Sequence, residues 1–459
     1  MSLRIPCIAG AVASIALGIA AVVSCSDSAA TSTGDGGAAI DPTGDGAASG
    51  EGGAGSDGAS GDTTCTRTIH VDPTFGKNGV VTDLGQVTVD YEDISFERTR
   101  AFPYPDGSLG LPGFPPVKLL ASGARDTSFD ADATIKAFQS QTGAVFAAGP
   151  ARAMFVSGSR SSGFQVYDAF VARLTSTGAL DSTYGSAGFA DLAHLGIAGA
   201  HVDVIVEYLV PLTSGALLVA GSMKPDGGAT DPRGHFLVRL TAAGLIDASF
   251  GKTGLTVYRT PYFDRLSGVA VHDDGTLAVA LEARNASAGP STINYGHVLR
   301  FTADGAPITT FGDAGAFDSK VLTDLATDIL SPQPGGFDVV RQSIGVARRI
   351  GPGGVYAFPF GVHGSLDIVP TTISGGDVVG ALRVVPGTQT PATGAVYVQR
   401  FTPEGQPCSA PVTVVVPGVR QDSMVFSPAG ASLFLTAAAD STDGSTFASR
   451  FVAKLVIDP

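Results

Sequence analysis

The chain has 459 residues and a formal net charge of −14, with 28 Lys and Arg against 42 Asp and Glu. An acidic chain without a run of basic residues excludes nucleic acid as an expected partner and argues against an anionic membrane surface. Its 61 Gly, with frequent Val, Thr and Ser, favour strands and turns over helices, and the absence of Trp excludes repeat families with Trp signatures.

Residues 1–24 have the features of a signal peptide. Arg4 supplies a positive charge near the start, and residues 8–23 are all apolar or small. This apolar stretch is too short for a comfortable membrane span. An ordinary secretory signal and an N-terminal anchor helix are the alternatives to the lipoprotein signal described next.

The signal ends in Val-Val-Ser followed by Cys25, which resembles the lipobox of bacterial lipoproteins, although Val22 stands where Leu is commoner. The resemblance implies cleavage before Cys25 and a diacylglyceryl group on its thiol. Each buried methylene contributes about 0.8 kcal/mol, and two or more chains hold a protein stably where one does not. We therefore expect a lipoprotein of the cell envelope, at the outer membrane and facing the periplasm or the surface, with the membrane as partner through this anchor.

Residues 25–64 follow as the lipidated Cys and a Gly/Ala/Ser/Asp-rich tether. After Cys25 this segment has seven acids, no Lys, Arg or aromatic residue, and Ile40 as its only large aliphatic. Such a composition buries too little surface to offset the entropy of ordering. The sequence predicts a disordered spacer with a reach of about 35 Å.

Two later stretches repeat one pattern: RLTSTGALDSTYGSAGF at 173–189 and RLTAAGLIDASFGKTGL at 239–255. Each begins with a basic residue and an apolar one, and has Gly five, Asp eight and an aromatic residue eleven positions after the basic residue. We call the basic residue the anchor and expect it to have a structural role on an inner strand of each sheet. Seven anchors are found: Lys118, Arg173, Arg239, Arg300, Arg349, Arg400 and Lys454.

A short polar turn containing Gly lies upstream of each anchor, between alternating apolar runs. VAVHDDGTLAVAL at 269–281 shows strand, Asp-Gly turn and strand most plainly. A period of about fifty residues with a hairpin in each unit is typical of β-propeller blades. The predicted turns are Asp106-Gly107, Thr142-Gly143, Ser214-Gly215, Asp274-Gly275, Gly335-Gly336, Gly375-Gly376 and Gly430.

The chain ends divide one repeat between them. Lys454 lies too close to the C-terminus to have its Asp and aromatic residue, but HVDPTFGKNGVV at 70–81 supplies Asp72 and Phe75. In a closed ring of sheets, pairing of the N- and C-terminal parts of one repeat leaves no strand edge open there. The sequence predicts an all-β domain at 65–459, a β-propeller of seven blades (six or eight as alternatives), closed by pairing of its N- and C-terminal segments.

The repeated unit, [L]DxxFGxxG…DGxxxVAG…FxxxRxxxxGxxD, resembles the delta-60 repeat family of bacteria, frequent in secreted myxobacterial proteins. The resemblance covers most of residues 68–459 and is poor between 316 and 350. It implies a β-propeller-like fold and no catalytic residues. The tether is also similar to spacers of myxobacterial surface lipoproteins.

Four cysteines are present, of which Cys7 is lost with the signal and Cys25 takes the lipid. Cys65 and Cys408 remain as an even pair in an exported protein, so a disulfide between them is possible. It would join the start of the propeller to its last repeat.

No catalytic, metal or cofactor site is predicted. The seven His are scattered, no Gly-x-Ser-x-Gly elbow is present, and the acidic loops lack the spacing of a calcium site. Asp126, Asp181 and Asp247 are expected to cap the connection after each anchor strand.

Two functions remain open at this point. The first is a monomeric envelope lipoprotein whose propeller binds or scaffolds an unknown protein or carbohydrate ligand through variable loops at one rim, with 186–206 and 222–234 as candidates. The second is a propeller enzyme of lactonase or sugar dehydrogenase type, with a site in the central channel.

Overall fold

Every described residue belongs to the unit Ala59–Pro459. The predicted signal peptide, the tether with Cys25, and Cys65 lie outside the described residues. The computed structural model describes residues 67–82, 84, 86–88, 100–113, 115–138, 145–163, 166–192, 203–224, 234–259, 263–284, 294–313, 315–319, 330–343, 346–353, 356–361, 368–373, 378–383, 395–402, 407–408, 410–415, 424–439 and 447–458.

The described strands pair into antiparallel sheets, which we number 1 to 7 along the chain. Sheet 1 contains β4 (Phe102–Pro103), β5 (Leu109–Leu111) and β6 (Val117–Leu119). Sheet 2 contains β7 (Phe146–Ala148), β8 (Met154–Gly163), β9 (Val166–Leu174) and β10 (Phe189–Asp191). Sheet 3 contains β11 (Asp203–Pro211), β12 (Leu217–Lys224), β13 (Gly234–Leu240) and β14 (Leu255–Arg259).

The remaining sheets continue the same order. Sheet 4 contains β15 (Phe263–Val271), β16 (Leu277–Arg284), β17 (Asn294–Phe301) and β18 (Ala316–Ser319). Sheet 5 contains β19 (Leu330–Gln333), β20 (Phe337–Ser343), β21 (Val346–Ile350) and β22 (Tyr356–Gly361). Sheet 6 contains β23 (Ile368–Thr372), β24 (Val378–Arg383), β25 (Ala395–Phe401) and β26 (Val412–Val415). Sheet 7 contains β27 (Val425–Ala429), β28 (Ser432–Ala439), β29 (Phe447–Ile457) and three N-terminal strands, β1 (Ile69–Val71), β2 (Val80–Val81) and β3 (Gln86–Thr88).

Sheets 1 to 4 and sheet 7 are apolar on both faces, because each contributes residues to two cores shared with its neighbours. On β12, Leu217 and Val219 belong to the core shared with sheet 2, whereas Leu218 and Ala220 belong to the core shared with sheet 4. Successive side chains of a strand point to opposite faces, so a strand buried on both sides has a continuous apolar run. The run LLVAG in β12 is such a case.

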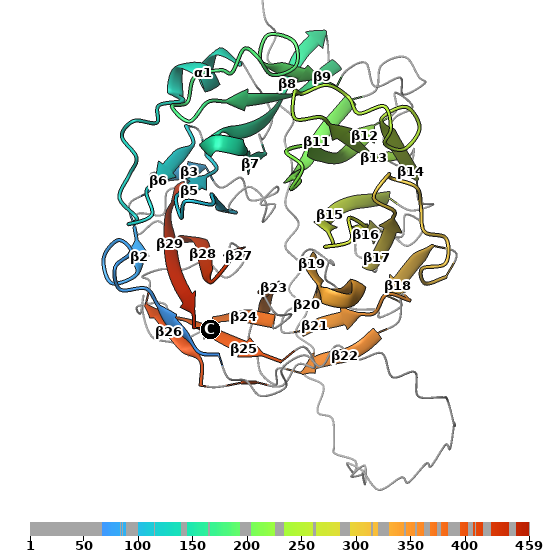
Figure 1. Cartoon of the computed structure of the whole chain (residues 1–459). Helices are drawn as coiled ribbons and strands as arrows, with labels where there is room; N and C mark the ends of the chain where they lie inside the picture. The colour runs from blue at the N-terminus through green and yellow to red at the C-terminus, as the bar shows by residue number, and fades with distance from the viewer. Residues whose placement is uncertain are drawn as a thin grey trace, which may run out of the picture. The chain divides into compact units, whose positions relative to one another are not determined.

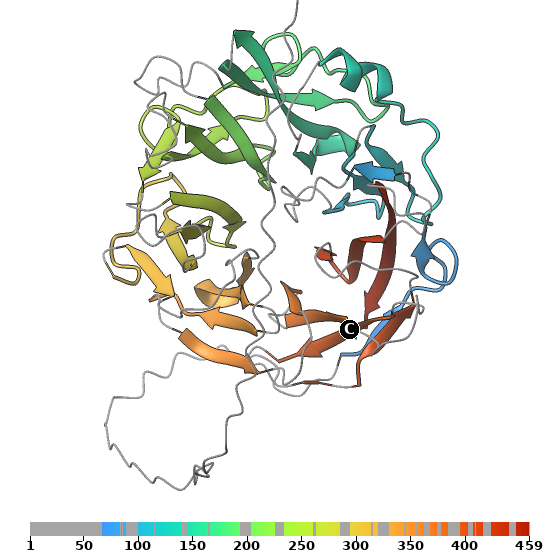
Figure 2. The ribbon, with the colours of Figure 1, turned by 180° about the vertical axis from the view of Figure 1, so that it is seen from behind.

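The sheets follow one another around a ring, with the first strand of each sheet nearest the centre (Figure 1, Figure 2). Contacts between these first strands run from β4 to β7, β11, β15, β19, β23 and β27, and from β27 back to β4. The protein is therefore a β-propeller, as the sequence predicted.

The first described strands complete the last sheet. β1, β2 and β3 all pair antiparallel along one edge of β29, in registers that include Ile69 opposite Ile457 and Val80 opposite Ala453. In the core between sheets 7 and 1, the rings of Phe75 and Phe434 meet edge to face with centroids 5.9 Å apart. The N-terminal segment thus supplies the outer edge of a sheet whose other three strands are β27, β28 and β29.

A backbone hydrogen bond recurs between consecutive sheets. The N–H twelve residues after an anchor donates to the carbonyl four residues after the next anchor, as from Gly185 to Ala243 at 2.7 Å. Gly185 has φ 56, and a Cβ there would lie 2.1 Å from the Phe189 carbonyl oxygen. The Gly of the repeat is therefore required by conformation and by space. The equivalent donors are Gly76, Asp130, Gly251 and Gly312, with acceptors Ser122, Thr177, Asp304 and Gly353.

Sheet 1 departs from the repeat because it has three described strands. Pro115 and Pro116 precede β6, and proline has no N–H to donate to an added strand. Helix α1 (Asp132–Ala137) follows where the other sheets have an outer strand, and its Ile135 packs into the core with sheet 2. The expectation of strands and turns alone is wrong at this point.

The first turn of sheet 2 also differs from the prediction. It lies at 149–153 and includes the 3-10 turn η2 (Pro150–Arg152), rather than at Thr142-Gly143, which lies outside the described residues. Ala151 and Arg152 have φ of 50 and 63, a conformation usually taken by Gly. Neither position is a glycine, and the sequence predicted no turn at Gly149, which begins this one. The corresponding turn of sheet 5 contains η4 (Pro334–Gly336).

None of the helices among the described residues is long and apolar enough to span a membrane.

Candidate functional site

The anchors lie on the third strand of each sheet, counted from the centre of the ring. In each sheet, the third strand ends at the turn that follows its anchor, which we call the anchor turn. The anchors therefore all lie at the same end of the ring. The side chain of Arg349 lies outside the described residues. The placements are Lys118 on β6, Arg173 on β9, Arg239 on β13, Arg300 on β17, Arg349 on β21, Arg400 on β25 and Lys454 on β29.

Arg173 shows what an anchor does. Its Nε lies 2.8 Å from Asp181 Oδ2, and its guanidinium lies 4.8 Å from the centre of the Tyr184 ring. A second nitrogen donates to the carbonyl of Ala242 in sheet 3 at 2.8 Å. Charge-assisted bonds and cation–π stacking are stronger when partly desolvated. One side chain thus joins its own anchor turn to the next sheet.

Arg239 repeats this arrangement in sheet 3. Its Nε lies 2.7 Å from Asp247 Oδ2, and its guanidinium lies 5.1 Å from the Phe250 ring centre. It donates to the carbonyl of Ala303 in sheet 4 at 2.9 Å. The contact to the next sheet therefore recurs with the spacing of the repeat.

The Asp of the repeat also closes a local turn, which confirms the capping expected of Asp126, Asp181 and Asp247. Asp181 Oδ1 accepts the Thr183 N–H at 3.0 Å and the Thr183 hydroxyl at 2.6 Å. The Thr183 hydroxyl, followed by its N–H and by Arg173, lowers the pKa of the Asp181 carboxyl. The carboxylate is therefore charged and fully used within the fold.

Lys454 takes its partners from the other end of the chain. Its Nζ lies 2.9 Å from Asp72 Oδ2 and 6.0 Å from the Phe75 ring centre. Burial alone raises the pKa of Asp72, but hydrogen bonds from Thr74 and Lys454 outweigh it and lower the pKa to about 2. The anchor arrangement at this junction is thus assembled from both chain ends.

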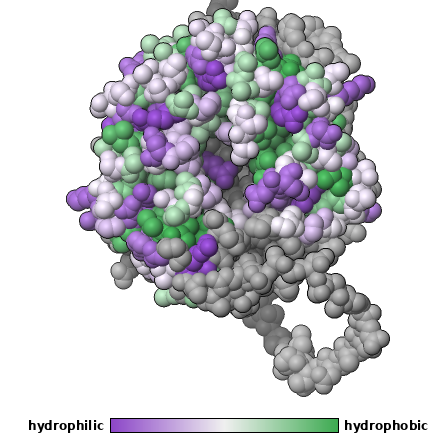
Figure 3. All heavy atoms as spheres, in the orientation of Figure 1, coloured by the Kyte–Doolittle hydropathy of each residue, from purple (hydrophilic) through white to green (hydrophobic). Residues whose placement is uncertain are grey.

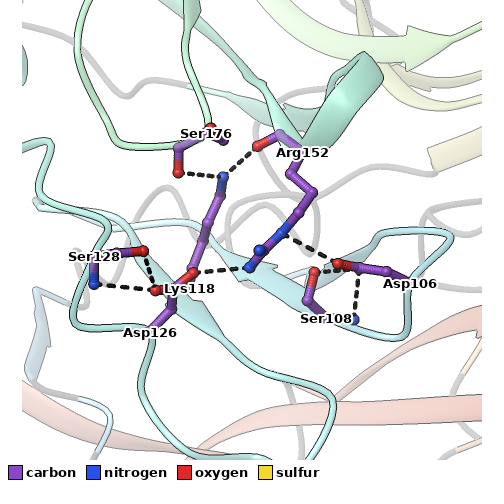
Figure 4. Close-up of polar contacts among 7 residues, drawn as sticks. All are labelled: Asp106, Ser108, Lys118, Asp126, Ser128, Arg152 and Ser176. Atoms are coloured by element: carbon purple, nitrogen blue, oxygen red, sulfur yellow. Dashed lines mark hydrogen bonds and ion pairs between the residues drawn. The ribbon is translucent and has the colours of Figure 1, made fainter.

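Lys118 departs from the pattern, as Figure 4 shows. Its Nζ donates to the carbonyls of Arg152 and Ser176 in sheet 2 and lies 4.5 Å from the Phe129 ring centre. Burial, and then the charge of Arg152, lowers the pKa of Lys118 to about 8. The ammonium makes the contact to the next sheet, but it does not take the acid of its own turn.

Arg152 binds that acid instead, from the strained turn η2. Its guanidinium lies 2.8 Å from Asp126 Oδ2 and 3.2 Å from Asp106 Oδ2 (Figure 4). A planar guanidinium bridges two carboxylates where a lysine ammonium is a single point charge. Lys118 and Arg152 together therefore replace the single arginine of sheets 2 and 3.

Arg300 also has a rearranged partner, because Ile308 stands where the repeat has Asp. Its guanidinium lies 2.5 Å from Oδ2 of Asp338, a fully buried residue of sheet 5, and 4.9 Å from the Phe311 ring centre. Nε2 of buried His272 lies 3.1 Å from Oδ1 of the same carboxylate. An acid from the next sheet thus joins two residues of sheet 4.

Arg400 and Cys408 lie beside the start of the described chain. Arg400 donates to the carbonyl of Arg67, and the Cys408 N–H donates to the Arg400 carbonyl at 3.0 Å. Cys408 is disulfide-bonded. Arg67 is two residues from Cys65, the predicted partner, which itself lies outside the described residues.

The four described histidines, His70, His235, His272 and His297, do not form one group. His235 is buried and stacks on Tyr258 with ring centres 5.5 Å apart, and His297 is buried on β17. His70 lies 3.3 Å from Asp458. Within the described ranges, no three His, Cys, Asp or Glu residues are placed to hold a metal ion. The other three, His194, His201 and His363, lie outside those ranges.

Sequence reasoning missed Arg152, Asp338 and Arg450. Arg152 and Asp338 each supply a charged group that their repeat lacks. The only sign of this in the sequence is that Lys118 and Ile308 depart from the repeated pattern. Arg450 of β29 is buried, and it donates to the carbonyl of Pro112 in sheet 1. It occupies no repeat position, and nothing in the sequence marks it.

No protein-family model and no curated protein matches this chain. Similar solved structures include the Trypanosoma rangeli sialidase in complex with the inhibitor DANA (TM-score 0.37, 10% identity, 80% of this chain and 59% of that one). They also include the Dos1 propeller (0.40, 11%, 82% and 93%) and a PL25 ulvan lyase bound to its saccharide (0.42, 10%, 84% and 96%). The match thus spans less than two thirds of the sialidase. The β-propeller assignment rests on the pairing and packing of this chain's own sheets.

Proposed function

We propose that this protein is a cell-envelope lipoprotein that presents a seven-bladed β-propeller as a binding or scaffold module. Residues 1–24 are its signal peptide, Cys25 carries the lipid, residues 26–64 are the tether, and 65–459 are the propeller. The lipobox-like Val-Val-Ser-Cys and the tether composition support the anchor, and the delta-60-like repeat supports the module. The ligand is a protein or a carbohydrate at the outer membrane.

The order of contacts supports the proposed blade number. Seven sheets of described strands succeed one another, and their first strands make contacts that return from β27 to β4. Sheets 1 to 4 and sheet 7 bury apolar residues against both neighbours. An arrangement that leaves no such face open is a closed circle. The pairing of β1 to β3 with β29 supports closure between sheets 7 and 1.

The observation that carries the binding role is the difference between the two ends of the sheets. At the anchor end, the same turns and the same inter-sheet bonds recur. At the other end, the second and third strands are joined by segments of unequal length: 164–165 in sheet 2, 225–233 in sheet 3 and 384–394 in sheet 6. Binding residues are commonly carried by variable loops on a rigid scaffold. We call this second end the variable end and place the ligand there.

The exposed surface does not separate into one polar and one apolar region on the face drawn in Figure 3, where hydrophilic and hydrophobic residues are interspersed. Recognition on such a face is expected to depend on local groups rather than on one broad apolar patch. This directs the search for ligand contacts to particular side chains at the variable end.

The test uses the full chain with Cys25→Ser, immobilised and exposed to purified outer-membrane polysaccharides and to solubilised envelope proteins. In one variant, 225–233 is replaced by a two-residue Asn-Gly turn; in the control, Gly353→Ala changes the anchor end. We expect the first to lose ligand and the second to retain it, with equal melting temperatures. Equal binding by both variants, or turnover of a substrate that survives the loop replacement, contradicts the proposal.

The anchor has its own test. Cys25→Ser is expected to move the protein from the membrane fraction to the soluble fraction. Retention of the variant in the membrane fraction contradicts the lipoprotein assignment.

A further inference from the structure

Arg450 is a buried cation for which the described residues supply no acid. It is 5% exposed, and burial lowers its pKa to about 10, with no neighbouring carboxylate to offset this. Its one hydrogen bond is to the carbonyl of Pro112, and its Nε has no hydrogen-bond partner. Arg173, Arg239 and Arg300, in contrast, each form an ion pair with a carboxylate.

The position of Arg450 places it between sheets 7 and 1. Val452, two residues along β29, packs into the core between these sheets, so Arg450 points to the same side of the strand. Arg450 is opposite Ala438, near the segment that joins β28 to β29, and Pro112 follows β5 in the connection to β6. Both connections belong to the variable end.

The chain makes room for this guanidinium. Gly113 has φ 153, and a Cβ there would lie 2.7 Å from an Arg450 terminal nitrogen. Any larger residue at 113 would displace the side chain. An unpaired buried charge lowers stability, whereas an apolar residue of similar size does not. A buried charge without a partner of opposite charge is therefore expected at functional positions.

We propose that Arg450 is the cationic group of an oxyanion-binding site at the variable end, between sheets 7 and 1, and that the ligand enters with a carboxylate, sulfate or phosphate group. A guanidinium offers paired N–H donors that match the two oxygens of such a group. The inference rests on the proposed binding role and adds to it the chemistry of the ligand.

The experiment measures thermal unfolding of the Cys25→Ser full chain in sodium glucuronate, sulfate, phosphate and chloride at equal ionic strength. The Arg450→Met variant and a control at an exposed lysine, Lys136→Met, are measured alongside. We expect one oxyanion to raise the unfolding temperature of the parent and of the Lys136 variant. The rise should be about 2 °C or more for each tenfold increase of the anion concentration above its dissociation constant. The Arg450→Met variant should show only the general salt effect. The responding anion identifies the group.

In chloride, Arg450→Met should be at least as stable as the parent, because the variant removes an unpaired buried charge. Arg450→Lys keeps the charge without the planar fork and should respond to the anion less than the parent. Equal oxyanion shifts in the parent and in Arg450→Met, or a large loss of stability in chloride, overturn the inference. If Arg450→Met still binds the ligand that the variable-end variant loses, this inference fails while the proposed function stands.

Discussion

Lys454, close to the C-terminus, forms an ion pair with Asp72 in the first described segment of the chain, with Nζ and Oδ2 2.9 Å apart. The backbone repeats the link, because the Asp72 N–H donates to the Lys454 carbonyl at 2.9 Å. These residues occupy the positions of Arg173 and Asp181 in sheet 2. The first described segment and the C-terminal strand therefore form between them the contact that Arg173 and Asp181 form within one repeat.

The Asp72 carboxylate should stabilise the protein in a defined pH range. Its folded pKa is about 2, below the unfolded value near 4, so its contribution is complete above about pH 4 and is lost as the pH falls toward 2. Asp72→Asn should reduce the free energy of unfolding by about 1–3 kcal/mol at pH 7. Urea unfolding at pH 7 and pH 2.5 measures this, and the difference from the parent should shrink at the lower pH. Asp313→Asn, at an exposed position, is the control.

Gly185 should tolerate no side chain. Gly185→Ala places a Cβ against the Phe189 carbonyl in a left-handed conformation and disturbs the bond to Ala243. We expect a loss of about 2 kcal/mol or more, read from the midpoint of denaturant unfolding. The matched control is Gly353→Ala, where a Cβ meets no atom within 4 Å. Equal effects of the two substitutions would contradict the role given to the repeat glycine.

Lys118 should give stability an alkaline pH dependence. Burial lowers its folded pKa to about 8, below the unfolded value near 10.4, so the unfolded chain binds more protons between these values. Stability attributable to Lys118 therefore rises as the pH increases from 8 to 10. Lys118→Met should remove this rise, whatever its effect at pH 7. Chemical unfolding of both proteins at pH 7, 8, 9 and 10 measures the difference, and parallel curves would refute the prediction.

Asp338 should be coupled to Arg300. Removing a buried carboxylate leaves a buried cation unpaired, so Asp338→Asn should cost about 3–5 kcal/mol. Arg300→Met in the same chain should recover part of this loss, because the unpaired charge is then gone. A double-mutant cycle on unfolding free energies measures the coupling. Additive effects of the two substitutions would show that the close approach of the two side chains contributes no stability.

The repeat made much of the fold predictable, because it is a regular requirement of packing. Gly at the turn, Asp after it and an aromatic residue further on are each needed for one bond or contact, so they recur in the sequence at fixed spacing. Lys454 with Asp72 and Phe75 could be matched across the chain ends for the same reason. The hairpin strands followed from apolar alternation between turns.

The departures from the repeat were not predictable, because they depend on neighbours distant in the sequence. Pro115 and Pro116, directly before β6, have no N–H to donate, and α1 follows in place of a strand. Arg152 takes up an acid left by a lysine anchor, and Asp338 replaces the carboxylate that Ile308 lacks. Arg450 belongs to no repeated pattern, so it can be recognised only from the packing of sheet 7 on sheet 1.

The central proposal is that the N-terminal segment closes the ring by completing sheet 7. It is tested most directly by the unfolding free energy of two rearranged chains, one lacking residues 67–88 and one with these residues moved behind residue 459 through a flexible linker. We expect the deletion to abolish cooperative unfolding and the permuted chain to unfold with nearly the parent free energy. A deleted chain as stable as the parent would contradict the account.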